Sequence, residues 1–114
     1  MKKIIAFLIV SFVICSTAYA HPPSDIKITY NLKTKIMTAI IMHNVSDVKK
    51  HFIYKIITGL NGKEIINQAR SQQDNNISQT VSYLIPDVNA GDSLSVEGYC
   101  NLSGSLKKEI KILE

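Results

Sequence analysis

Cysteine and histidine are scarce in this chain, whose 114 residues include two cysteines and three histidines. Cys15 lies within an apolar N-terminal segment that reads as a removable leader, so Cys100 would be the only thiol of the mature chain. A single cysteine excludes an internal disulfide bond. In an exported protein such a thiol is buried and inert, paired with another chain, or a ligand.

The patterns of several common enzyme classes are also missing. There is no recognisable Ser-His-Asp arrangement, no carboxylate pair of the kind that hydrolyses sugars, and no glycine-rich loop for a phosphate. No apolar run after the leader is long enough to span a bilayer. Charge is weak: without Lys2 and Lys3 the thirteen basic residues become eleven, against nine acidic ones, a net charge of +2. This scattered charge does not indicate nucleic-acid binding.

The start of the chain reads as a signal peptide. A basic N-terminus precedes an apolar run at residues 4–15, and residues 18–20 form an Ala-Tyr-Ala cleavage site. Cleavage there would make His21 the first residue of the mature chain. We therefore predict that residues 1–20 are removed and that residues 21–114 form one exported domain, periplasmic or secreted, with no membrane association after the leader is lost.

Alternation of apolar and polar residues predicts strands in the mature segment, as at Ile26 and Ile28. Asn61 and Gly62 predict a hairpin turn, because both residues tolerate positive φ. Residues 70–76 form a polar stretch with no apolar anchor and are expected to be a loop. The predicted strands are 26–30, 35–42, 52–60, 63–69, 77–85, 93–99 and 106–113. About seven short strands without a helix predict an all-β protein, an immunoglobulin-like β-sandwich.

The scarce residues fall at the ends of these strands. His43 follows the second strand, His51 precedes the third, and Cys100 ends a later one, while His21 would be the first mature residue. Loops at one end of a sandwich lie close together, and imidazoles with a thiolate match the preferences of transition metals. A single histidine at a strand end is more often a surface residue, and a single buried cysteine is often a small hydrophobe. The hypothesis of a metal site at His21, His43, His51 and Cys100 therefore depends on the four residues occurring together, and not on any one of them.

Two segments carry a family resemblance. Residues 51–56, His-Phe-Ile-Tyr-Lys-Ile, preceded by His-Asn-Val at 43–45, resemble the His-Pro-Met and His-Tyr-Ile-x-Trp-Ile motifs of superoxide reductases, the desulfoferrodoxin and neelaredoxin family. Residues 100–104, Cys-Asn-Leu-Ser-Gly, resemble that family's Cys-Asn-x-His-Gly. The resemblance implies an immunoglobulin-like sandwich, one mononuclear iron that alternates between Fe2+ and Fe3+, and reduction of superoxide to hydrogen peroxide.

The same resemblance implies roles for individual residues. Cys100 would be the axial thiolate ligand, and His43 and His51 would be equatorial ligands. His21 would be a third equatorial ligand, because its separation from His43 is roughly that between the family's first histidine and the His-Pro-Met motif. Ser103 stands where the family motif has another histidine, and the family's Glu-Lys pair before the first histidine has no counterpart. No catalytic residue is assigned, and whether the chain is an enzyme stays open.

The resemblance also implies partners and surroundings for the metal. The partners would be superoxide or another small anion and an electron donor that the sequence does not identify; a homo-oligomer is left open. Backbone N–H groups of residues 102–104 would donate hydrogen bonds to the sulfur of Cys100. Lys49 and Lys50, beside His51, are the cations that could draw in an anion.

Two alternatives remain open. A free α-amine on His21 would add a nitrogen donor, and Pro22 has no amide N–H to compete, so the nitrogen-rich set would also suit copper. Residues 51–65 also resemble the small immunoglobulin-like subunit of the thiosulfate-oxidation carrier complex. That subunit binds a partner chain and holds no metal, and in this interpretation Cys100 is a core residue.

Overall fold

The computed structural model describes residues 20–113, which form seven β-strands and no helix. The strands are β1 (Asp25–Asn31), β2 (Ile36–Met42), β3 (Ile53–Leu60), β4 (Lys63–Ala69), β5 (Ser78–Leu84), β6 (Ser93–Cys100) and β7 (Ser105–Lys111). Within this part of the chain, no helix suited to crossing a membrane was found. The predicted leader lies outside the described residues, except for Ala20.

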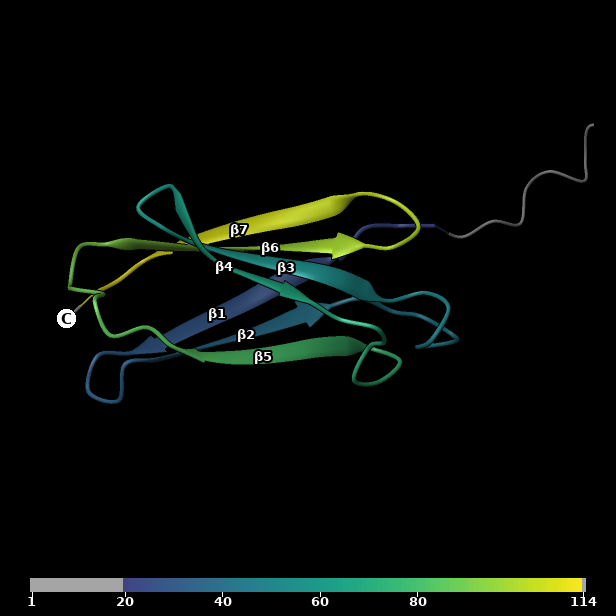
Figure 1. Ribbon diagram of the computed structural model, residues 1–114, viewed down its shortest axis with the longest axis horizontal. Coiled ribbons are helices and arrows are strands. Elements are labelled where there is room, and N and C mark those ends of the chain that lie inside the picture. Colours follow the sequence, from purple (N-terminus) through teal and green to yellow (C-terminus); the bar gives the residue numbers. More distant parts are fainter. Residues whose placement is uncertain (1–19, 114) are drawn as a thin grey trace, which may run out of the picture.

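The strands form two antiparallel sheets that pack face to face (Figure 1). One sheet has the order β1-β2-β5 and the other the order β4-β3-β6-β7. This is an immunoglobulin-like arrangement in which the fourth strand pairs with the third; in constant domains it joins the other sheet. The prediction of an all-β sandwich of about seven strands is confirmed, and the ends of each strand lie within two residues of the prediction.

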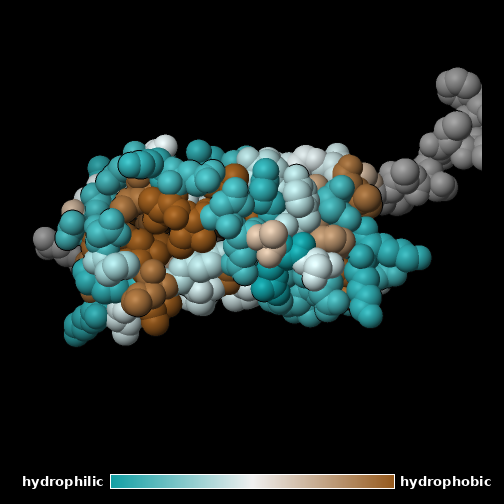
Figure 2. All heavy atoms as spheres, in the orientation of Figure 1, coloured by the Kyte–Doolittle hydropathy of each residue, from teal (hydrophilic) through white to brown (hydrophobic). Residues whose placement is uncertain are grey.

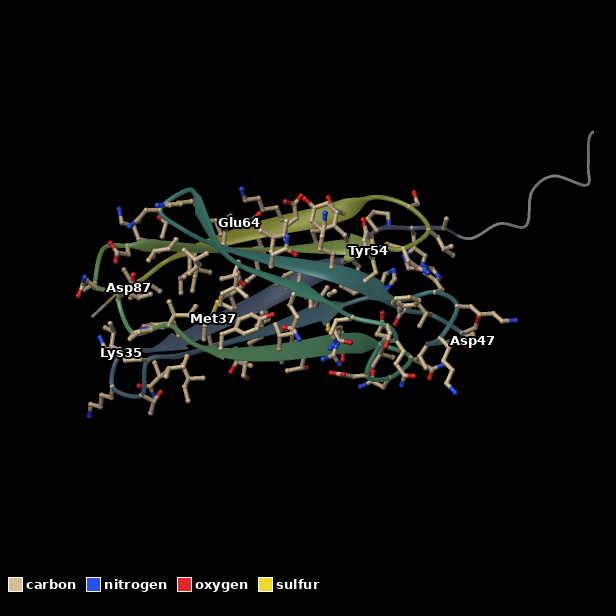
Figure 3. All side chains as sticks on the ribbon, in the orientation of Figure 1. Lys35, Met37, Asp47, Tyr54, Glu64 and Asp87 are labelled. Atoms are coloured by element: carbon tan, nitrogen blue, oxygen red, sulfur yellow. The ribbon has the colours of Figure 1, made fainter. Side chains whose placement is uncertain are left out.

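The core lies between the sheets because every second residue of the inner strands points inward. On β2 the inward residues are Met37, Ala39 and Ile41, all fully buried, and Figure 3 shows Met37 between the sheets. In Figure 2 apolar residues show between the edges of the two sheets, in the left half of the view. The opposite end is more polar, and the histidines belong to that end.

A tight turn and a bulge lie at the two ends of β3. Asn61 and Gly62 follow the strand with φ of 52° and 81°, which confirms the predicted hairpin turn into β4. At the other end, the pairing of β3 with β6 shifts between Ile53 and Lys55, so one extra residue lies on β3. This bulge lets Ile53 and Ile56 both face the core although they are three residues apart.

One end of the sandwich gathers four segments that are distant in the sequence (Figure 1). They are the chain before β1, the connection from β2 to β3, the connection from β4 to β5, and the turn from β6 to β7. The first and last of these touch, because a Cβ atom added to Gly104 would lie 3.3 Å from Cβ of Pro22. The antiparallel order of the strands therefore brings the predicted ligand positions to the same end.

Candidate metal centre

Three histidines meet at this end of the sandwich. His21 precedes β1, His43 follows β2, and His51 precedes β3. The centroids of their rings are 4.7 to 4.9 Å apart, with edge-to-face orientation. One ring nitrogen from each residue can be chosen so that all lie within 4.8 Å of one another. We call these residues the three-histidine cluster. Its geometry allows one metal ion to be held between the rings.

Backbone hydrogen bonds fix the positions of His43 and His51. The N–H of His43 donates to the carbonyl oxygen of Ile77 at 2.9 Å, which holds the end of β2 against the start of β5. His51 ends a tight turn in which the N–H groups of Lys50 and His51 donate to the carbonyl oxygen of Asp47 at 3.1 and 3.0 Å. Figure 3 shows Asp47 at this end of the molecule. Both imidazoles are thus carried on ordered backbone.

His43 is fully buried, and both of its ring nitrogens have an oxygen neighbour. Nδ1 lies 2.8 Å from Oε1 of Gln73, and Nε2 lies 3.0 Å from the carbonyl oxygen of His21. The amide nitrogen of Gln73 donates to the carbonyl oxygens of His43 at 2.7 Å and Asn75 at 2.9 Å. The connection between β4 and β5 therefore contributes a buried side chain to the cluster.

The ring nitrogens of His21 and His43 make more contacts with oxygen atoms than neutral imidazoles have N–H groups to donate. Nδ1 of His21 lies 3.0 Å from the carbonyl oxygen of Pro22, and Nε2 lies 2.9 Å from that of Asn44. With the two contacts of His43, this makes four nitrogen–oxygen contacts, whereas two neutral imidazoles supply only two N–H groups. In the remaining contacts a lone pair faces a lone pair. A proton at each of these contacts, or a metal ion that displaces the carbonyl oxygen, would relieve this.

His51 has a ring nitrogen without a partner. Its Nε2 atom is buried and has no hydrogen-bond partner. Burial lowers the pKa of His51 below its ordinary value, and the charges of His43 and His21 lower it further. The backbone of His21 partly opposes this lowering of the pKa. His51 is therefore held as a neutral imidazole, the form that binds metals.

Cys100 lies at the same end but is not a member of the cluster. It is the last residue of β6, pairs with Ile53 and is 5% exposed, with a free thiol. The backbone N–H of Leu102 donates to its sulfur at 3.4 Å, as predicted for one of residues 102–104. Ser103 is exposed and lines a shallow surface depression beside Cys100. The group that could hold a metal contains the three histidines and not this thiol.

Asn101 joins the Cys100 turn to the His51 turn. Its backbone N–H donates to the carbonyl oxygen of Phe52 at 3.0 Å, and its side-chain oxygen accepts from the N–H of Phe52 at 2.9 Å. Its amide nitrogen also donates to the carbonyl oxygen of Lys50 at 3.0 Å. The two segments that carry the superoxide reductase resemblance are thus bonded directly to each other.

Some features of the site agree with the sequence patterns and others do not. Lys49 and Lys50 are exposed on the turn before His51, so their side chains face solvent. Gln73 was not identified from the sequence, because a polar residue within the polar stretch 70–76 gives no signal of burial. It is nevertheless fully buried and bonded to His43. No pattern of single residues could have indicated it.

Comparisons with protein families, with curated proteins and with solved structures found no match to this chain. Its class is therefore defined by the fold and the cluster: a seven-stranded β-sandwich with a histidine group that could bind a metal ion. The resemblance to superoxide reductases stays a prediction. So do the export of the chain and the identity of its partners.

Proposed function

We propose that this protein is an exported binder of one transition-metal ion, held by the imidazoles of His21, His43 and His51. The observation that carries the proposal is the imbalance of nitrogen–oxygen contacts in the cluster, together with the unpartnered Nε2 of His51. Buried polar groups without partners are costly, and a coordinated cation would satisfy them. The spacing of the ring nitrogens suits one ion rather than two.

Three protein ligands leave room for an exchangeable one. Metal sites with three protein ligands typically keep a further position for water or a substrate, whereas structural sites are closed. The cluster is partly open, since His21 and His51 are only half-buried. Imidazole ligands suit zinc, copper, iron and nickel, so the donor set alone does not select one of them. The site therefore fits a reactive or exchangeable metal better than a purely structural one.

Iron is the metal that the superoxide reductase resemblance supports. The resemblance makes Cys100 a further donor, but in this structure the thiol lies outside the three-histidine cluster, so the three imidazoles alone would hold the iron. Superoxide would take up one electron and two protons to give hydrogen peroxide; iron would supply the electron in passing from Fe2+ to Fe3+, and a separate electron donor would return it. Lys49 and Lys50 provide exposed positive charge near the cluster for a small anion.

Copper is a second candidate, supported by the position of the His21 main chain. The carbonyl oxygen of His21 lies 3.0 Å from Nε2 of His43, so the backbone of His21 reaches the cluster. If the leader is cleaved after Ala20, the α-amine of His21 becomes a further nitrogen donor. Divalent copper binds nitrogen-rich sites more tightly than divalent iron does.

Metal analysis of the protein purified from its native compartment tests the proposal. We expect about one transition-metal ion per chain in the wild type and none in a His43→Ala/His51→Ala double variant, with Lys49→Ala as an exposed control that retains the ion. A thiolate-to-metal absorption band that disappears in Cys100→Ala would show that Cys100 is a further ligand, and elemental analysis would distinguish iron from copper. A wild-type protein without metal that also fails to bind added Fe2+, Cu2+ or Zn2+ would refute the proposal. Such a result would leave the partner-binding module as the alternative.

A further inference from the structure

We infer that Gln73 is a positioning residue that fixes the imidazole of His43 with its proton on Nδ1, so that Nε2 is the nitrogen offered to a metal. Gln73 touches the ring of His43 from the side opposite the carbonyl of His21, since the two contact different ring nitrogens. This inference rests on the proposed metal site, but it concerns a residue on the connection between β4 and β5, which the metal-ligand pattern does not include.

Only one orientation of the Gln73 amide satisfies its neighbours. The amide nitrogen donates to the carbonyl oxygens of His43 and Asn75 at 2.7 and 2.9 Å. If the amide were reversed, its oxygen would face these two oxygens, and two buried hydrogen bonds would be lost. Oε1 of Gln73 must therefore face Nδ1 of His43, 2.8 Å away. An amide oxygen can only accept, so the ring nitrogen must carry the proton.

The tautomer of His43 follows from this bond. A neutral imidazole carries one N–H, so a proton on Nδ1 leaves a lone pair on Nε2. That lone pair faces the carbonyl oxygen of His21 at 3.0 Å, on the side of the ring where His21 lies, and this oxygen would move away when a metal ion binds Nε2. Ligating histidines generally donate their other N–H to an oxygen that fixes the ring and raises its basicity. Gln73 occupies this position for His43.

A second buried glutamine, Gln79, allows the positioning role of Gln73 to be distinguished from its contribution to packing. Gln79 is as fully buried as Gln73 and lies near it, but its amide bonds to Asp74 and Thr80 and not to a histidine. Replacing either glutamine by methionine removes a buried amide of the same size. Only Gln73→Met removes the acceptor from His43. Gln79→Met is therefore the matched control for the loss of stability.

The tautomer itself can be measured without metal. In the metal-free wild type at about pH 8, where ordinary imidazoles are neutral, nitrogen NMR should show His43 protonated on Nδ1 and bare on Nε2. The His43 signal should be unchanged in Gln79→Met. In Gln73→Met the proton should no longer prefer Nδ1 over Nε2. A wild-type His43 protonated on Nε2 would overturn the inference, and this result does not depend on any variant folding.

The consequence for metal binding is tested by titration with Zn2+. We expect affinity to fall roughly 10–100-fold in Gln73→Met, as for other residues that orient a ligating histidine. Gln79→Met should bind within about threefold of wild type. Equal affinities of Gln73→Met and Gln79→Met would refute the positioning role. Failure of the wild type to bind Zn2+, Cu2+ or Fe2+ would refute the metal site and, with it, the metal role of Gln73, whatever the NMR shows.

Discussion

Replacing His51 by phenylalanine should stabilise the metal-free protein and abolish its response to metal. His51 is the member of the cluster whose Nε2 atom is buried without a partner. In the metal-free chain, folding costs this atom its hydrogen bond to water and gives it no other partner. A phenylalanine ring has nearly the same shape and has no polar atom to leave unsatisfied.

The size of the effect follows from the cost of the unpartnered nitrogen. A buried polar group without a partner costs about 1–3 kcal/mol. Phenylalanine is slightly larger than histidine, and overpacking offsets part of the gain; the half-buried position limits this cost. We therefore expect the free energy of unfolding of the metal-free variant to rise by about 1 kcal/mol. Wild type, in contrast, should gain about 2.7 kcal/mol from a metal at 100 times its Kd.

Urea denaturation of both proteins measures these quantities, first with a chelator and then with added Zn2+. Lys50→Ala, an exposed neighbour, serves as the control and should change neither quantity by more than about 0.5 kcal/mol. If His51→Phe is less stable than wild type in the chelator, His51 contributes to packing rather than to binding. If both proteins respond equally to Zn2+, His51 is not a ligand.

Two further predictions concern pH and the link between the turns. Because the pKa of His51 is lowered, chiefly by burial, the unfolded chain binds more protons than the folded chain below about pH 6.5. Stability is thus unaffected by the titration of His51 above that pH and falls as pH drops through the folded-state pKa. Urea denaturation should show a steeper loss of stability between about pH 7.5 and 5.5 in wild type than in His51→Phe; equal slopes would contradict the pKa shift. Asn101→Ala removes the side-chain bonds to Phe52 and Lys50 and should cost about 1–2 kcal/mol. It should also weaken Zn2+ binding, whereas Asn67→Ala, exposed on β4, should do neither.

The strands were predictable because their signal is local. Apolar and polar residues alternate along strands such as β1 and β2. A polar stretch, or a two-residue turn such as Asn61-Gly62, separates each strand from the next. The convergence of strand ends follows from antiparallel pairing, which places the end of β2 and the start of β3 at one end of the sandwich. Positions adjacent to strands, such as His43 and His51, could therefore be placed from the sequence.

Features that depend on loop conformation could not be predicted. The bulge at Ile53 and Lys55 changes which residues of β3 face the core, and nothing in the alternation marks it in advance. Gln73 is buried because the connection from β4 to β5 folds back over the cluster, where its backbone N–H donates to the carbonyl of Val48 at 3.0 Å. Such contacts join segments that are far apart in the chain, so no local sequence pattern predicts them.

The polar groups at this end of the molecule argue for a binding site rather than for a packing accident. Gln79 and Asp74 form a network in which each amide and carboxylate atom used has a partner. In the three-histidine cluster, by contrast, neutral His21 and His43 have too few protons for their oxygen neighbours, and Nε2 of His51 has no partner. Among the described residues, the only other buried side-chain atom without a partner is Oγ1 of Thr58. Apolar residues at these positions would avoid the cost, and local rules are broken most often at functional sites. The deficit is of positive charge, which is what a metal ion supplies.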